Sequence, residues 1–278
     1  YLTTIGFQGE QVGAVFSTLA WGSIISAFFV SLIADRYFSA QKLIGFLHVI
    51  GGVLIFISSP LTEPGSLFWT MLAFMICYMP TVALASTIAL HNVSDAGRQF
   101  PRIRVLGTIG WVISGLAAST LKIENTNIPM IMAATASIIL GLFSFTLPDT
   151  PPQRKEGKVS FASVLGLDAL KMMKERSFAV LIISTLFISI PFAMYFQYTN
   201  MSMNEAGIKN VAGIMSIGQM SEVLFMILMP LIFIRLGVKR MLLMGMIAWI
   251  IRYVLFAFGN NAELVWFFYL GIFLHGVC

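Results

Sequence analysis

The chain has 278 residues, of which 58% are hydrophobic and 10% are charged. A soluble domain usually carries about 25% charged residues, and a chain with so few could not cover its core with polar surface. The apolar residues lie in long blocks, and blocks of about 20 apolar residues are typical of membrane-spanning helices. The composition therefore excludes an ordinary soluble domain and predicts an integral membrane protein.

The net charge of +5 arises from 17 Lys and Arg residues against 12 Asp and Glu residues. These basic residues lie between the apolar blocks and form no basic face with interleaved aromatics, so the charge does not indicate a nucleic-acid partner. Cys77 lies inside an apolar block and Cys278 is the last residue, a pattern that predicts neither a disulfide framework nor a metal site. The sequence has no nucleotide-binding, zinc-protease or serine-hydrolase motif. We therefore expect neither an enzyme nor a cofactor, and transport driven by ATP would need a second chain.

The apolar blocks are continuous, which favours helices over the alternating strands of a membrane barrel. We predict about nine membrane-spanning helices. In chain order they cover residues 12–34, 43–59, 66–89, 103–121, 127–147, 178–200, 211–234, 241–258 and 264–278. The expected fold class is thus all-α and integral to the membrane.

The connections between these spans alternate in charge. Fourteen of the 17 Lys and Arg residues lie in every second connection, around residues 36–42, 98–104, 154–176 and 235–240. Cytoplasmic loops carry the excess of Lys and Arg, so these connections are predicted to be cytoplasmic and the first span to run inward. A chain that starts in the cytoplasm would need a further helix before Tyr1, and we therefore expect a piece of a longer protein.

The longest connection, residues 148–177, is predicted to be a cytoplasmic linker between a bundle at 1–147 and a partial bundle at 178–278. It opens with three prolines and continues with basic residues. An amphipathic stretch follows, in which apolar residues stand beside charged ones: Phe161, Val164, Leu165, Leu167 and Leu170 beside Asp168, Lys171 and Lys174. Such a stretch is typical of a helix that lies on the membrane surface, and a simple tether is the interpretation we prefer.

The chain resembles itself at an offset of 200 residues. Identical residues recur at Gly13 and Gly213, Leu43 and Leu243, Gly45 and Gly245, Ile50 and Ile250, and Phe56 and Phe256. Each copy has a span, a short basic turn and another span. Two bundles related by repetition are the usual build of secondary transporters, with the substrate site near the midplane between them.

The first basic turn, Ser31-Leu-Ile-Ala-Asp35-Arg36, resembles the loop motif Gly-x-x-x-Asp-Arg of the major facilitator superfamily, with Ser31 in place of Gly. The resemblance implies a major facilitator fold in which Asp35 and Arg36 belong to a conformational motif. It also implies that the visible spans are helices two to ten of twelve. Helices two to six then form 1–147, and helices seven to ten form 178–278.

Glu222 is the only carboxylate that falls in the middle of a predicted span. Ionisable residues at membrane depth are costly and indicate function by default. Gln219 precedes Glu222 by three residues, so the two side chains share one face of a helix. The functional interpretation is that Glu222 takes up and releases a proton or binds a polar substrate. The alternative is a hydrogen bond that holds helices together.

Arg104, Thr108 and Trp111 follow the spacing i, i+4, i+7 and so line one face of another predicted helix. The guanidinium of Arg104, the hydroxyl of Thr108 and the flat ring of Trp111 would suit a sugar that bears a flat base, through hydrogen bonds and stacking. The equal alternative is that Arg104 is one more cytoplasmic charge whose side chain reaches the interface. Trp111 would then pack against lipid or protein.

Three further charged or titratable residues fall inside predicted spans. Arg252 is near mid-span and could pair with Glu222 or with a residue beyond the end of the chain, and we favour a structural pairing. His48 and His275 are each interpreted as hydrogen-bonded structural residues rather than proton carriers.

Several stretches together resemble the nucleoside:proton symporters, the bacterial nucleoside permeases of the major facilitator superfamily. The most specific is Phe100-Pro-Arg-Ile-Arg-Val-Leu-Gly-Thr-Ile-Gly-Trp111. The others lie at 34–40, 78–81, 165–168, 216–222 and 249–259. The resemblance covers nearly the whole chain.

This resemblance implies uptake of nucleosides driven by the proton gradient through alternating access. It implies substrate contacts from the residues already singled out: Arg104, Thr108, Trp111, Gln219 and Glu222, with Glu222 also coupling protons. In one departure, Pro191 and Met194 stand where the family's seventh helix can carry Gln and Asn. Tyr195, Gln197 or Tyr198 could substitute for that pair, and Arg252 is kept as a separate possible site residue.

The sequence therefore predicts a monomeric, multi-pass protein of the bacterial inner membrane that imports nucleosides with protons. One alternative is a major facilitator permease for another small polar solute, such as a sugar or a peptidoglycan fragment, which would keep Glu222 without needing Trp111. Another is a membrane receptor built on the same scaffold that binds its ligand without moving it.

Overall fold

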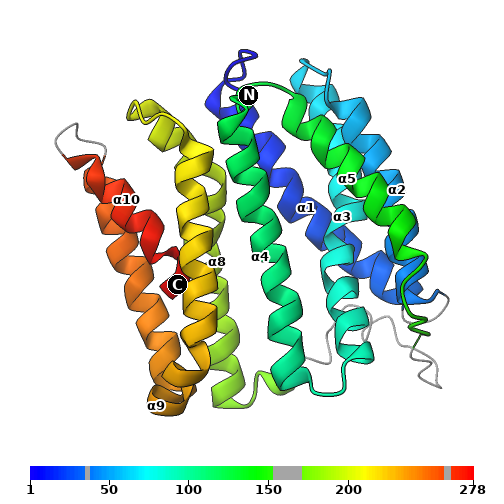
Figure 1. Ribbon diagram of the computed structural model, residues 1–278, viewed down its shortest axis with the longest axis vertical. Helices are drawn as coiled ribbons and strands as arrows, with labels where there is room; N and C mark the ends of the chain where they lie inside the picture. Colours follow the sequence, from blue (N-terminus) through cyan, green and yellow to red (C-terminus); the bar gives the residue numbers. More distant parts are fainter. Residues whose placement is uncertain (35–37, 153–170, 260–263) are drawn as a thin grey trace. The chain divides into compact units, whose positions relative to one another are not determined.

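The computed structural model describes residues 1–34, 38–152, 171–259 and 264–278, and every regular element in these ranges is helical (Figure 1). The α-helices are α1 (Gly9–Ala34), α2 (Ala40–Ser58), α3 (Pro64–Asn92), α4 (Ala96–Thr120), α5 (Ile128–Ser144), α8 (Arg176–Glu205), α9 (Val211–Gly259) and α10 (Trp266–Phe273). A 3-10 turn, η2 (Leu274–Val277), follows α10. The loop motif at Asp35 and Arg36 and the apolar stretch 161–170 lie outside the described residues.

Six described helical segments are long and apolar enough to cross a membrane. Two of them come from α9, which is interrupted at Gly237, where the backbone has φ 68° and ψ 171°. Glycine adopts this left-handed conformation without steric cost, so the chain bends there. The segments Val211–Met229 and Arg235–Gly259 correspond to the two predicted spans on either side of a basic turn. The predicted class, an all-α multi-pass membrane protein, is confirmed.

Helices α1, α2, α3 and α5 belong to a first unit, made of Tyr1–Ser94 and Asn125–Ile183. Glycines bring α2 and α5 into close contact: a Cβ on Gly52 would stand 2.9 Å from the carbonyl oxygen of Ala134, and one on Gly141 equally close to that of Gly45. Small residues at such interfaces are typical of membrane helices, whose association depends on van der Waals packing rather than on burial from water.

Polar side chains add specific ties within this unit. The Nδ1 atom of His48 on α2 lies 2.9 Å from the hydroxyl of Ser137 on α5, and that hydroxyl donates to the carbonyl of His48 at 2.9 Å. His48 therefore occupies a hydrogen-bonded packing position. At the start of α2, the side-chain oxygen of Gln41 accepts from the backbone N–H of Thr150 at 3.0 Å.

The second unit contains Asp95–Glu124 and Ser184–Cys278, and so combines α4 with most of α8, with α9 and with α10. Here α4 packs against α9 through paired glycines and serines. The hydroxyl of Ser216 fills the space that a Cβ on Gly115 would need, and the hydroxyl of Ser119 lies 2.9 Å from the place of a Cβ on Gly213. The predicted division at 1–147 and 178–278 stays a prediction.

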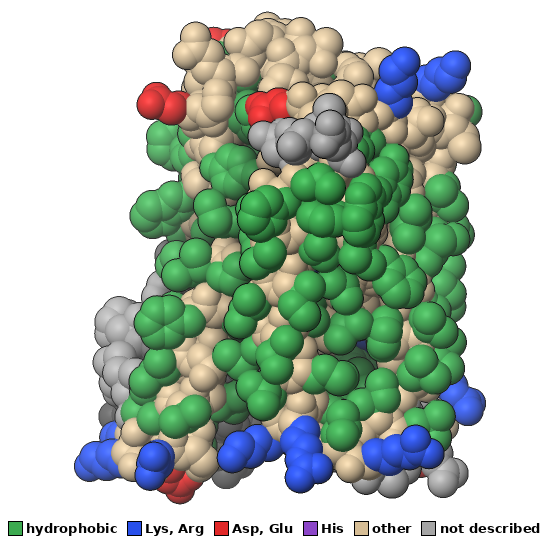
Figure 2. All heavy atoms as spheres, turned by 90° about the vertical axis from the view of Figure 1, so that its left-hand side faces the viewer, with side chains coloured by type: hydrophobic (Ala, Val, Ile, Leu, Met, Phe, Trp, Pro, Cys, Tyr) green, Lys and Arg blue, Asp and Glu red, His purple; other side chains and the backbone are tan. Residues whose placement is uncertain are grey.

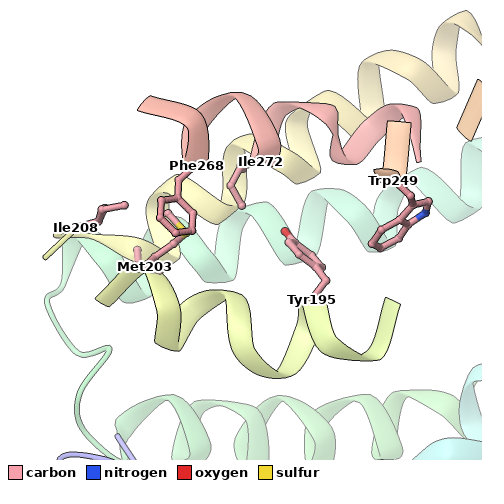
Figure 3. Close-up of a cluster of buried hydrophobic side chains, with 7 residues drawn as sticks. Tyr195, Met203, Ile208, Trp249, Phe268 and Ile272 are labelled. Carbon is pink, nitrogen blue, oxygen red and sulfur yellow. The ribbon is translucent and has the colours of Figure 1, made fainter. Parts of the chain in front are cut away.

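The core of the second unit lies among α8, α9 and α10 (Figure 3). Its buried members are Tyr195, Met203, Ile208, Val211, Trp249, Phe268 and Ile272. Elsewhere the helices expose large apolar side chains, such as Leu186 and Phe187 on α8. Figure 2 shows a face on which hydrophobic side chains form a broad band, with Lys and Arg gathered mainly along its lower edge. Such a surface suits a lipid environment with one basic side.

Candidate functional site

Two groups that the sequence placed on separate helices meet in the second unit. The hydroxyl of Thr108 on α4 donates to Oε1 of Glu222 on α9 at 3.4 Å. Thr108 is buried, whereas the side chain of Glu222 is about one-third exposed, at 32%. The same two helices approach each other closely at Gly115 and Ser216.

His275 in η2 lies beside the Gln219–Glu222 pair. Its Nε2 atom is 3.0 Å from Nε2 of Gln219 and 3.8 Å from Oε2 of Glu222. The predicted sharing of one helix face by Gln219 and Glu222 thus places both against the same imidazole. Gln219 is buried, so it does not present its side chain freely to solvent.

Arg252 approaches the other side of the same imidazole. Its Nη1 atom lies 3.0 Å from Nδ1 of His275, and its guanidinium carbon lies 3.6 Å from the ring centre of Tyr195. Among the described residues it forms no ion pair with Glu222, which was one of its two expected partners. Arg252 is fully buried, and its Nε and Nη2 atoms have no hydrogen-bond partner in the described part of the chain.

The residues proposed to replace the family's polar pair on α8 differ in exposure. Tyr195 is buried, with its ring stacked 5.0 Å from the imidazole of His275. Figure 3 shows it reaching from α8 into the cluster beside Trp249. Tyr198 is exposed and Gln197 is half-buried. The carbonyl of Pro191 accepts a hydrogen bond from the hydroxyl of Tyr253, so this helix is tied to α9 at the point of departure from the family pattern.

Arg104 and Trp111 are more open than Thr108, which lies between them on α4. Arg104 is exposed. Trp111 is 52% exposed, and its ring meets Phe196 edge to face at 6.3 Å. The predicted face of α4 therefore has a closed centre, where Thr108 meets Glu222, and two open flanks that a solute could contact.

The sequence did not single out His275 as part of the site. Its position in a predicted span was visible, but His48 shared that property and proved to be a packing residue. The contacts that distinguish His275 come from residues 23 and 56 positions away in the sequence. Only the packing of η2 against α9 reveals them.

The arrangement can exchange a proton and bind polar groups. A carboxylate accepts hydrogen bonds when ionised and donates one when protonated. Glu222 is open on one side and has a hydroxyl and an imidazole on its other sides, so its protonation changes what it offers to a solute. Among the described residues, no group of three or more His, Cys, Asp or Glu side chains could hold a metal ion.

Known proteins resemble this chain over its whole length. The model of the family described as Nucleoside H+ symporter matches residues 1–278. YegT of Escherichia coli (strain K12), whose name assigns it to nucleoside transporters, is 40% identical over an alignment that covers 100% of the chain and 67% of YegT. The nucleoside permease NupG of the same organism is 29% identical, covering 94% of the chain and 68% of NupG. The xanthosine permease of E. coli is 30% identical, covering 93% of the chain and 65% of that protein.

Solved structures agree with these sequence matches. A crystal structure of a mutant of the nucleoside transporter NupG superposes with a TM-score of 0.86 at 28% identity, covering 99% of the chain and 72% of the NupG chain. A second NupG structure gives a TM-score of 0.82 at 29% identity over the same shares. The described helices thus have the major facilitator fold. The chain spans about two thirds of the length of its relatives.

Proposed function

The chain belongs to the nucleoside H+ symporter family, and from that premise we propose that Glu222 is the residue through which it couples nucleoside import to proton entry. Family membership and the transporter relatives make it a proton-coupled nucleoside transporter rather than an enzyme. The roles of individual residues, import by alternating access, a monomeric state and a place in the bacterial inner membrane are our proposals.

The contact between Thr108 and Glu222 is the observation that carries this proposal. Ionised Glu222 accepts the hydroxyl hydrogen of Thr108, whereas protonated Glu222 can donate a hydrogen bond of its own. Protonation therefore rearranges the hydrogen bonds between α4 and α9. A transporter whose two helices respond to protonation at their contact has a physical means of linking proton binding to a conformational change.

The open flanks of α4 supply the contacts that a nucleoside needs. The exposed ring of Trp111 can stack on a base, since base–aromatic stacking contributes about 1–3 kcal/mol per base. The guanidinium of Arg104 offers several donors to carbonyl groups of the base or to ribose oxygens. We assign contacts with the ribose hydroxyl groups to Thr108, Gln219 and Glu222, of which Glu222 has the more exposed side chain.

Uptake of labelled uridine and adenosine tests the proposal. The full-length protein is expressed in cells that lack their own nucleoside permeases, with and without a protonophore. We expect accumulation that collapses when the protonophore is added. Persistent uptake would mean a facilitator without proton coupling. Binding or localisation to the membrane without any nucleoside uptake would leave a permease for another solute or a receptor.

Substituting Glu222→Gln tests the assignment of the coupling role to this residue. We expect proton-driven accumulation to fall by at least about tenfold, because a hydrogen bond to a charged group contributes about 1.5–3 kcal/mol. Its pH dependence should also flatten. Glu205→Gln at the exposed end of α8 is the matched control and should leave uptake unchanged. Wild-type accumulation and pH dependence in the Glu222→Gln protein would remove the coupling role.

A further inference from the structure

His275 lies where three polar side chains converge in the second unit. Arg252 faces its Nδ1 atom, while Gln219 and Glu222 face its Nε2 atom. Its side chain is only 9% exposed. The ring also stacks on Tyr195, so its orientation is set by packing as well as by hydrogen bonds.

The contact with Arg252 determines which ring nitrogen carries the hydrogen. A guanidinium can only donate hydrogen bonds. At 3.0 Å from Nη1 of Arg252, the Nδ1 atom of His275 must therefore be the acceptor and carry no hydrogen. The ring is then neutral with its hydrogen on Nε2. Protonation at Nδ1 would set two N–H groups against each other beside a buried positive charge.

The hydrogen on Nε2 points toward the site residues of α9. An amide nitrogen also only donates, so the Gln219 amide takes the orientation in which its oxygen faces Nε2, 3.0 Å being a normal hydrogen-bond length. Oε2 of Glu222 lies 3.8 Å from the same nitrogen, which is longer than a hydrogen bond but close enough for the N–H to stabilise the carboxylate electrostatically. The imidazole thus donates to Gln219, has Glu222 beside the same N–H, and accepts from Arg252.

We propose that His275 is a positioning residue for proton coupling, held as the neutral Nε2–H tautomer by Arg252 and aligning Gln219 and Glu222 with its single N–H. This inference rests on the proposed function, in which Glu222 carries the proton. His275 itself stays neutral and is not a proton carrier. The charged or titratable groups that face its ring are Glu222 and Arg252 from α9 and Tyr195 from α8. Cys278 interacts with the guanidinium of Arg252.

Two substitutions separate the two sides of the imidazole. In His275→Asn the shorter amide can accept from Arg252 near the place of Nδ1, but it cannot reach the place of Nε2. In His275→Gln the longer amide can place an N–H near that of Nε2 and so restore the donor to Gln219 and Glu222. Comparing the two variants therefore shows whether transport depends on the contact at Nδ1 or on the donor at Nε2.

Labelled uridine uptake by the full-length variants is measured between pH 5.5 and 8, together with counterflow exchange, which needs no proton gradient. We expect His275→Asn to lose about tenfold in accumulation, equivalent to about 1.4 kcal/mol, with a changed pH profile and persistent exchange. His275→Gln should stay within about threefold of the wild type in both. A wild-type pH profile in His275→Asn, or equal losses in the two variants, would overturn the proposal.

The tautomer is tested independently of transport by ¹⁵N NMR of histidine-labelled full-length protein. The His275 signals are assigned by their loss in His275→Gln. A neutral ring protonated on Nε2 is expected at pH 7, and a ring protonated on Nδ1 or on both nitrogens would overturn the inference even if uptake is proton-driven. If the wild type takes up no nucleoside, the proposed function fails while the spectrum still decides the tautomer.

Discussion

The hydroxyl of Thr108 and the carboxylate of Glu222 meet at 3.4 Å although 114 residues separate them in the sequence. The contact joins the closed centre of the α4 face to the one carboxylate that the sequence places at mid-span. The same two helices approach each other closely at Gly115–Ser216 and Gly213–Ser119, where small residues stand opposite each other. We therefore expect substitutions of Thr108 to change nucleoside uptake more than the stability of the fold.

Thr108→Val removes the hydroxyl and nearly keeps the shape of the side chain. We expect the apparent KM for uridine to rise about fivefold, because a hydrogen bond of this kind contributes about 1 kcal/mol. Thr108→Ser should retain most of the activity. The measurement is initial-rate uptake at several uridine concentrations.

Thr120→Val provides the control for this substitution on the same helix. The hydroxyl of Thr120 donates to the carbonyl of Leu116 within α4, at 2.8 Å, and to that of Ala117. Its loss should leave KM unchanged. Equal kinetics of Thr108→Val and the wild type would show that the contact with Glu222 plays no part in substrate binding.

Trp111 is predicted to act through its flat ring rather than through its indole N–H. Trp111→Phe should keep stacking and raise KM by less than about threefold, whereas Trp111→Ala should raise it by about tenfold or more, in line with the stacking energy of a base. Trp69→Ala is a matched control, because Trp69 is an exposed tryptophan of the first unit. Similar KM values for Trp111→Ala and the wild type would favour a substrate without a base.

Much of the fold could be predicted because membrane helices follow directly from apolar blocks. The break in α9 was also expected, since a basic turn separates its two apolar segments, but its location at Gly237 comes from the backbone. The grouping of α4 with α9 could not be predicted, because the glycine and serine pairs that join them are local features of two distant segments. An apolar pattern identifies the membrane-spanning helices but does not determine which of them pack against one another.

The site was predicted in part for a similar reason. Glu222 stands out in any span because an ionisable group there is costly, and Gln219 follows from helix periodicity. Arg252 was equally visible, yet the hydrogen-bond partner that it has in the described part of the chain, His275, was not among those expected for it. The hydrogen-bond partners of buried polar groups are determined by tertiary packing, and the periodicity of a single helix does not predict that packing.

Gly52→Ala should destabilise the first unit by crowding α2 against α5. The added Cβ would stand 2.6 Å from Cγ1 of Ile138 and 2.9 Å from the carbonyl oxygen of Ala134, and the backbone atom cannot move without shifting the helix. Overpacking of this kind costs about 1–3 kcal/mol, which corresponds to a fall in Tm of about 5 °C. The measurement is thermal unfolding of the full-length protein in detergent.

Gly110→Ala in α4 is the control for this crowding. A Cβ on Gly110 would have no atom within 4 Å, and alanine favours a helix over glycine by about 1 kcal/mol. Its Tm should therefore equal or exceed that of the wild type. A Gly52→Ala protein as stable as Gly110→Ala would contradict the close packing of α2 and α5.

Glu63 caps the start of α3 and should make stability depend on pH. Its carboxylate accepts from the backbone N–H groups of Gly65, at 2.9 Å, and of Ser66. The side-chain hydrogen bond with Ser66, followed by these backbone hydrogen bonds, lowers the pKa of Glu63 below its ordinary value of 4.5. Because the pKa is lowered in the folded state, the carboxylate stabilises the protein above pH 4.5. This contribution is lost as the pH falls through the folded-state pKa.

Glu63→Gln should therefore lower Tm at pH 7, where the wild-type carboxylate is ionised in both states and bonds the helix start only in the folded one. The difference in Tm between the two proteins should shrink as the pH is lowered below 4.5. Glu10→Gln, in the first turn of α1, is the matched control for removing an exposed negative charge near a helix start. A Tm difference that is equal at pH 7 and below the folded-state pKa would mean that the cap acts through shape rather than charge.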